Sequence, residues 1–256
     1  MKRIVSGVVG LMALGAAAPA VAADLAPRTY TKAPPPIVAA VYDWSGFYIG
    51  LNGGGGSSHK CWTNTSTALG VTVPNISEGC HDASGGMVGG QLGYRWQQSN
   101  WVFGVEAQGD WADFKGSNAS LLFINTTNQT KVDAVGLFTG QVGYAWNSVL
   151  WYLKGGAAVA DDKYNGIATS TGLVFDHATE TRWGGTVGAG LEFSFASNWS
   201  VGVEYNHLFM GSRTLTFTSN VPLPGTFSRA DSIKQDVDMA TVRVNYRWGG
   251  PVIAKF

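Results

Sequence analysis

The chain has two cysteines, Cys61 and Cys80, and their chemistry is the easiest to anticipate. In a protein that leaves the cytoplasm, two cysteines most simply form a disulfide. His59 and His81 lie beside them, which makes a metal site the alternative, but zinc ligands usually show tighter spacing. We therefore predict a Cys61–Cys80 disulfide and no metal ion. In the entropic model, closing this loop contributes about 3 kcal/mol to stability.

Motifs for catalysis or phosphate binding are weak in this sequence. The glycine run Gly53–Gly56 superficially suggests a phosphate loop, but neither a helix nor a Lys-Ser/Thr pair follows it. Nucleophilic catalysis would require a nucleophile and a base brought together, and no Gly-x-Ser-x-Gly elbow or compact Ser/His/Asp cluster stands out. We expect no enzymatic activity and no cofactor.

A set of acidic and basic residues falls on one parity of the alternating segments described below, opposite to the apolar residues. Acids and bases occur in similar number. If these segments close into a small β-barrel, as argued below, its lumen has room only for side chains. Because an unpaired buried charge is strongly unfavourable, we expect these charges to face the interior and to pair with each other. The predicted interior charges are Arg95, Glu106, Asp110, Lys154, Glu192, Glu204, Arg243 and Arg247, and Arg182 shares their parity.

The segment Gly89–Trp111 positions several of these charges and contains two alternating runs around a polar turn at Gln98-Ser99-Asn100. Alternation with period two over this length indicates β-strands. Aromatic residues crowd the turn on the apolar face, as in a strand that crosses a bilayer. Along the whole chain this pattern predicts an aromatic girdle of Tyr94, Trp96, Trp101, Tyr144, Trp146, Trp151, Trp199, Tyr246 and Trp248. His207 also falls on the lipid-facing parity, near a loop, and we do not interpret it as a ligand.

The motif Gln91-Leu-Gly-Tyr94-Arg-Trp96 recurs at Gln141–Trp146 and, more loosely, near residue 190, which indicates a repeated hairpin. Tight turns near residues 98–100, 147–149 and 197–198 alternate with long polar segments. We predict four long loops: one ending near Gly85, then 115–131, 161–180 and 211–234. The strands between them, about ten to fourteen residues long, match what a tilted membrane strand needs. Only helices and closed barrels satisfy every peptide group in hydrocarbon. We therefore predict an all-β fold: an eight-stranded antiparallel up-and-down transmembrane β-barrel with short periplasmic turns and long extracellular loops.

Composition agrees with this class of protein. The 256 residues include 17 Lys and Arg against 17 Asp and Glu, so a basic surface for nucleic acid is not expected. Charged residues make up 13%, against about 25% in typical soluble domains. Beyond the N-terminus, no segment approaches the roughly 18 consecutive apolar residues of a membrane helix.

The N-terminus has the pattern of a secretory signal peptide over residues 1–22. Lys2 and Arg3 are followed by an apolar stretch and by small residues at the cleavage position, which is after Ala22 or Ala23. A proline-rich periplasmic linker is predicted over residues 23–43, and the barrel over 44–256. The mature protein is expected in the outer membrane.

Three stretches resemble a known group of proteins: WSGFYIGLNGGGG, GGQLGYRW and VRVNYRWGGPVIAKF. They are similar to the porin-family small outer-membrane β-barrels of alphaproteobacteria, which include major surface antigens and hemin-binding barrels. The resemblance implies an eight-stranded barrel surrounded by outer-membrane lipid and lipopolysaccharide. It also implies insertion by the barrel-assembly machinery, which reads a C-terminal aromatic residue, either Phe256 or Trp248.

These observations leave three hypotheses for the function. The first is a structural, surface-exposed barrel with a lumen plugged by paired charges. The second is a narrow channel for ions or small solutes, against which the small lumen argues. The third is hemin capture, for which the resemblance is the precedent; His59, His81, His177 and Tyr164 on the predicted loops are the candidate ligands.

Overall fold

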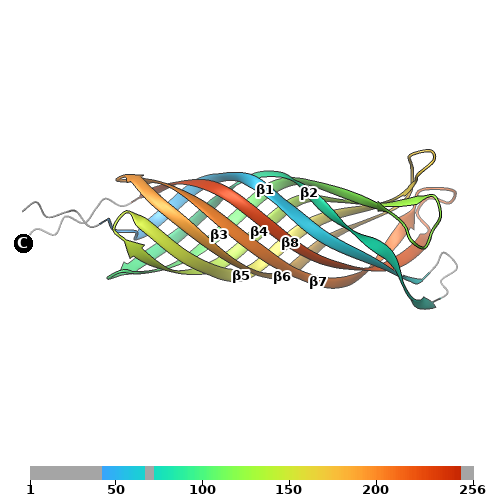
Figure 1. Ribbon diagram of the computed structural model, residues 1–256, viewed down its shortest axis with the longest axis horizontal. Helices are drawn as coiled ribbons and strands as arrows, with labels where there is room; N and C mark the ends of the chain where they lie inside the picture. Colours follow the sequence, from blue (N-terminus) through green and yellow to red (C-terminus); the bar gives the residue numbers. More distant parts are fainter. Residues whose placement is uncertain (1–41, 67–71, 249–256) are drawn as a thin grey trace, which may run out of the picture. The chain divides into compact units, whose positions relative to one another are not determined.

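The computed structural model describes residues 42–66 and 72–248, which form a closed antiparallel β-barrel (Figure 1). Each strand pairs with its neighbours in sequence, and β1 pairs with β8 to close the cylinder. Within these residues no helix is long and apolar enough to cross a membrane. The predicted fold is confirmed. The eight strands are β1 (Gly46–Ser66), β2 (Thr72–Gln98), β3 (Trp101–Ala119), β4 (Thr126–Trp146), β5 (Val149–Ala168), β6 (Leu173–Ala196), β7 (Trp199–Ser219) and β8 (Phe227–Trp248).

One end of the barrel, the turn end, is formed by the short connections after β2, β4 and β6. Each connection is two residues long, at 99–100, 147–148 and 197–198. Ser99 and Asn147 have φ of 57° and 52°, the left-handed backbone that tight hairpins use. The opposite end, the loop end, carries the connections 120–125, 169–172 and 220–226.

The strands are much longer than predicted, between 19 and 27 residues, and this corrects the loop assignments. Most of the predicted loops 115–131, 161–180 and 211–234 are strand, as is most of the polar segment before Gly85. Inside and outside continue to alternate there, for example at Lys60, Trp62 and Asn64, which are buried while their neighbours are more exposed. The outward residues in this part are polar instead of apolar, so a search for apolar alternation ends too early.

The two faces of the sheet differ in residue type because successive side chains point to opposite faces. Inward positions also need space for large side chains. A Cβ on Gly93 would lie 2.5 Å from the Tyr48 hydroxyl, and a Cβ on Gly190 would lie 2.3 Å from the Tyr152 ring. Glycine at these two positions therefore lets the two tyrosines extend across the lumen.

The ladders are irregular about halfway along the barrel. The register shifts between Trp111 and Phe114 on β3 and between Val132 and Ala134 on β4. Between β6 and β7, pairing stops at His177 and resumes at Gly185. These bulges lie where the outward residues change from apolar to charged.

Candidate functional site: the apolar belt and the filled lumen

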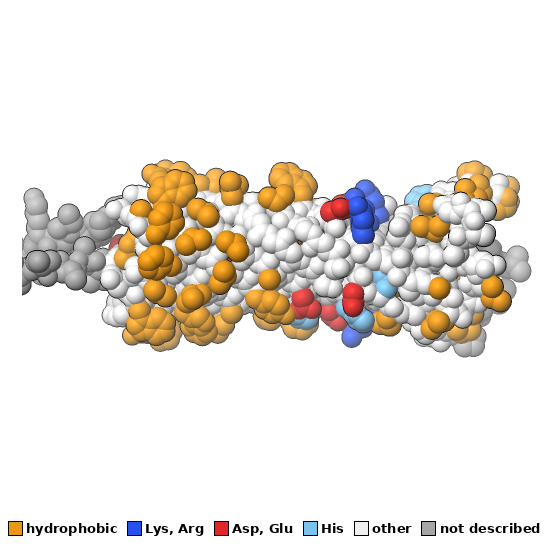
Figure 2. Space-filling model, turned by 45° about the horizontal axis from the view of Figure 1, so that its top comes forward, with side chains coloured by type: hydrophobic (Ala, Val, Ile, Leu, Met, Phe, Trp, Pro, Cys, Tyr) orange, Lys and Arg blue, Asp and Glu red, His pale blue; other side chains and the backbone are white. Residues whose placement is uncertain are grey.

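The outward face near the turn end carries a continuous apolar belt, visible in Figure 2 as hydrophobic side chains covering that part of the barrel. On β3 the belt runs from Trp101 to Trp111, which matches the 9–11 residues that a tilted strand needs to cross a bilayer. Its exposed members include Phe47, Ile49, Leu51, Val88, Leu92, Val105, Phe138, Val142, Leu153, Val187, Leu191, Phe193, Phe195, Val201, Val203, Tyr205, Val242 and Val244.

The residues of the predicted aromatic girdle lie on this belt toward the turn end. Trp96, Trp101, Trp146, Trp151, Trp199 and Trp248 are exposed, as is Tyr94, whereas Tyr144 and Tyr246 are half-buried. Neighbouring rings pack against each other, as in the edge-to-face pair of Trp101 and Tyr144 at 5.5 Å. Such amphipathic rings suit the boundary between hydrocarbon and headgroups.

A charged ring follows the belt toward the loop end, and Figure 2 shows acidic and basic side chains gathered there. On β3, β4 and β5 the lysines of this ring alternate with acids, so that Lys131 contacts Asp133 at 2.6 Å and Asp113 at 3.6 Å. His207 belongs to the same zone and lies 2.6 Å from Asp238. The other members of the ring are Lys115, Lys163, Arg213, Lys234 and Asp236. Glu180, on the inward parity, lies 3.9 Å from Arg213 and contacts the buried Arg182 at 2.6 Å.

Inside the belt, six of the eight predicted interior charges form the turn-side network, all of them buried. Lys154 contacts Glu106 at 3.0 Å and Glu204 at 2.6 Å, and Arg243 forms ion pairs with the same two carboxylates. Separately, Arg95 contacts Glu192 at 2.9 Å. Three bases thus face three acids across the lumen.

Tyrosine and amide side chains extend this network to every strand. Tyr48 on β1 donates to Glu106 at 2.6 Å, and Tyr152 on β5 donates to Glu204 at 2.6 Å. Gln141 on β4 accepts a hydrogen bond from Arg95 at 3.3 Å. Because the members come from all eight strands, the network ties the wall of the barrel together through its centre.

Two predicted interior charges are buried but pair with no charge in the described part of the chain, contrary to expectation. Asp110 accepts a hydrogen bond from Gln108 at 2.9 Å, and no ion pair to it occurs among the described residues. Arg247 donates to the backbone carbonyl of Ser45 at 2.8 Å and lies over the ring of Tyr42. A charged group can be satisfied by neutral partners, which residue parity does not reveal.

Apolar side chains fill the lumen on both sides of the turn-side network. At the turn end, Trp44 is buried against Val102, Ala145, Leu150 and Tyr152. Toward the loop end, an apolar layer contains Met87, Phe114, Val132, Val135, Leu137, Leu208, Met210, Val237 and Met239 with four alanines. Along β5 the inward residues therefore run from apolar to charged and back to apolar.

A second buried group of charges, the loop-side cluster, was missed by the sequence reasoning. Arg229 contacts Glu78 at 2.8 Å, Asp176 at 3.1 Å and Asp231 at 3.4 Å. Burial, with two further acids nearby, raises the pKa of Asp231 to about 7, although Arg229 opposes this. One base against three acids makes this cluster negative when all of its carboxyls are ionised.

Between the apolar layer and the loop-side cluster, Lys60 contacts Asp162 at 2.7 Å and Tyr164 at 3.1 Å. Burial lowers the pKa of Lys60 to about 8, against the opposing effect of Asp162. Trp62 and Phe217 pack beside Tyr164. Arg182 donates to the Ile233 carbonyl at 3.0 Å, near the interruption between β6 and β7.

The predicted disulfide joins Cys61 on β1 to Cys80 on β2, directly across the ladder. Among the described residues, the group able to offer three metal-binding atoms is His59 with these two cysteines, all within 4.8 Å of one another. Two of its three donors are sulfurs of the disulfide, and metal ligation needs thiolates. The oxidised site is therefore unsuited to a metal ion.

The four candidate hemin ligands do not come together and do not lie on loops. His59 points outward from β1, whereas His81 is buried inside, beside Asn118 at 2.8 Å and Thr130 at 3.0 Å. Tyr164 is buried in the lumen, and His177 is exposed on β6. Placing these residues on loops was the error, because adjacent strand residues such as Lys60 and His59 face opposite sides.

A pocket of about 550 Å³ opens at the loop end, lined by Leu122, Phe123, Ile124 and Phe175, with Arg229 at its edge. The Arg229 guanidinium already contacts three carboxylates, so it offers no unpaired charge to an anionic ligand.

The signal peptide, most of the linker and Phe256 lie outside the described residues. Two aromatic residues, Trp248 and Phe256, could end the assembly signal. The structure describes Trp248, which is the last residue of β8.

Comparisons with known proteins agree with this geometry. A family model described as an outer membrane protein beta-barrel domain matches residues 7–248. A 31 kDa outer-membrane immunogenic protein of Brucella melitensis is 29% identical over 247 residues, covering 90% of this chain and 93% of that protein. A 22 kDa outer membrane protein of Rhizobium leguminosarum is 28% identical over 188 residues, covering 73% and 71%. The outer membrane protein OprG of Pseudomonas aeruginosa has a similar fold, with 12% identity, coverage of 81% and 98%, and a TM-score of 0.50.

Proposed function

The chain belongs to the outer membrane protein beta-barrel family. We propose that it is a non-conducting, structural barrel whose loop end is displayed at the cell surface. The apolar belt anchors it in the membrane, and the polar outer halves of the strands extend beyond the bilayer. The relative in Brucella melitensis is named an immunogenic protein, which supports exposure of this end to the surroundings.

The filling of the lumen carries this proposal. Leu137, Leu208 and Val237 in the apolar layer have no exposed surface, and neither does Ile233 nearer the loop end. An ion on its way through would have to displace this layer and then break the ion pairs around Arg243. Both steps are unfavourable in a packed, low-dielectric interior.

Planar-bilayer recording tests the proposal. The purified, folded protein is expected to add no steady conductance, while a general porin inserted under the same conditions gives open-channel steps. A reproducible single-channel conductance that scales with protein concentration would contradict a non-conducting role and favour the channel alternative.

We also propose partners for the two outward zones. Acyl chains would cover the apolar belt, and the charged ring would lie among the headgroups of lipopolysaccharide, since both signs of charge occur there. Insertion by the barrel-assembly machinery through the C-terminal strand stays a prediction. Trp248, at the end of β8, is the aromatic residue that the machinery would read there. Truncation before Trp248, compared with truncation after it, would test which aromatic residue is read.

A further inference from the structure

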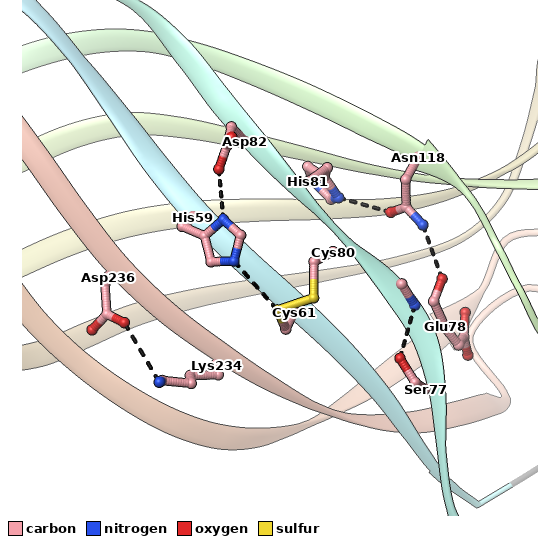
Figure 3. Close-up of a disulfide and its surroundings, with 11 residues drawn as sticks. His59, Cys61, Ser77, Glu78, Cys80, His81, Asp82, Asn118, Lys234 and Asp236 are labelled. Carbon is pink, nitrogen blue, oxygen red and sulfur yellow. Dashed lines mark hydrogen bonds and ion pairs between the residues drawn. A yellow bond between two sulfur atoms is a disulfide. The ribbon is translucent and has the colours of Figure 1, made fainter.

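Two cross-strand pairs form a compact group on the outward face of β1 and β2 (Figure 3). Cys61 is opposite Cys80, and His59 is opposite Asp82. Residues two apart on a strand share a face, so all four side chains project together. They follow the apolar belt along β1, on the loop-end side of Ser57, and so face water instead of lipid.

The imidazole of His59 connects a carboxylate to one sulfur of the disulfide. Its Nδ1 lies 2.6 Å from Asp82 Oδ1, and its Nε2 lies 3.5 Å from Cys61 Sγ. An acid on one ring nitrogen fixes the orientation of the ring and so directs its other nitrogen toward the sulfur. On the other side, β8 places Lys234 opposite Cys61 and Asp236 opposite His59.

The two sulfurs are not equivalent. Cys80 is exposed, whereas Cys61 is half-buried and has the imidazole and Lys234 as neighbours. A nucleophile from solution therefore reaches Cys80 more easily. If it attacks there, the departing sulfur is Cys61, beside the groups that stabilise a thiolate.

We propose that Cys61–Cys80 is a thiol–disulfide exchange site that captures small aqueous thiols at Cys80. The attacking thiolate forms a new S–S bond with Cys80 Sγ while the Cys61–Cys80 bond breaks. The electron pair of that bond goes to Cys61 Sγ, which takes the proton from His59 Nε2. One disulfide and one thiol are consumed and one of each is formed, so no other oxidant or reductant is needed. Asp82 is a positioning residue for His59.

The test uses the folded, oxidised protein in detergent with reduced glutathione as the probe. Iodoacetamide quenching followed by peptide mass spectrometry locates the glutathione and the free thiol. We expect glutathione on Cys80 and the alkyl group on Cys61. A thiolate that neighbouring groups stabilise leaves faster. His59→Ala removes the ring nitrogen 3.5 Å from Cys61 Sγ and should therefore slow the exchange about tenfold.

Two further variants separate chemistry from folding. His177→Ala removes an exposed histidine on β6 and is the matched control, expected to react like the wild type. Asp82→Asn removes the carboxylate that orients the His59 ring, so His59→Ala should slow the exchange less in an Asp82→Asn background than in the wild type. Band shift on unboiled gels verifies that each variant is folded.

Equal modification of both sulfurs, or equal exchange rates for the wild type and for His59→Ala, would overturn the proposal. A positive exchange result with a conducting barrel would instead contradict only the proposed non-conducting role. The two ideas therefore fail separately.

Discussion

Replacing Lys154 by methionine should expose how strongly the turn-side network supports the barrel. The ammonium lies within 3.0 Å of Glu106 and Glu204, and none of the three side chains is exposed. The wild-type network has three bases and three acids, so Lys154→Met leaves one buried negative charge without compensation. Breaking a buried ion pair in this way costs about 3–5 kcal/mol.

Urea unfolding of the barrel in detergent, followed by tryptophan fluorescence and by band shift on gels, measures this loss. With a slope of about 2 kcal/mol per molar urea, the midpoint should fall by about 2 M. The double variant Lys154→Met with Glu204→Gln restores the charge balance and should recover about half of the loss or more. Lys115→Met, in an exposed pair with Asp113, is the matched control and should change little.

An unchanged midpoint for Lys154→Met would refute the reasoning, since it would mean that the pairs contribute nothing to stability. A double variant less stable than the single one would refute it as well, because charge balance would then not be the cause.

Three further predictions concern other parts of the barrel. Val105→Lys, on the apolar belt, should destabilise the barrel folded in liposomes by about 2–4 kcal/mol. Ser117→Lys, on the same face of the same strand but beyond the charged ring, should have little effect. Because burial raises the pKa of Asp231 to about 7, the folded barrel binds a proton that the unfolded chain releases near pH 4, so stability falls as pH rises from about 4 to 7. Asp231→Asn should remove that part of the slope, seen as a smaller difference between urea midpoints at pH 5 and pH 8; an unchanged difference would contradict the assignment. Serine at both Cys61 and Cys80 should cost at most about 3 kcal/mol and should increase proteolysis at the loop end, with the apolar belt still protected.

The membrane-crossing half of the barrel could be predicted from the sequence because its two faces differ sharply. On β3, Val105 and Trp111 alternate with Glu106 and Asp110, so parity alone assigns inside and outside. The disulfide could be anticipated because an exported chain with two cysteines has one intramolecular pairing.

The other half could not be predicted in the same way. Outward residues such as Lys115 and inward residues such as Asn128 and Thr130 are all polar, so the alternation disappears from a hydropathy pattern while it persists in burial. One signal was available: Lys60, Trp62 and Asn64 share the parity of the inward residues of β1. Partner choice, as for Arg247 and the carbonyl of Ser45, depends on three-dimensional register and needs coordinates.

The central claim is that the apolar belt lies in the outer membrane and the polar half of the barrel projects outside the cell. Single-cysteine labelling on intact cells with a membrane-impermeant maleimide tests it most directly, since the described residues contain no free cysteine. We expect Ser117→Cys to be labelled on intact cells, Gln98→Cys at the turn end to be labelled only after permeabilisation, and Val105→Cys to resist labelling in both. Labelling of Gln98→Cys but not of Ser117→Cys on intact cells would contradict this orientation, and ready labelling of Val105→Cys would contradict the assignment of the belt to lipid.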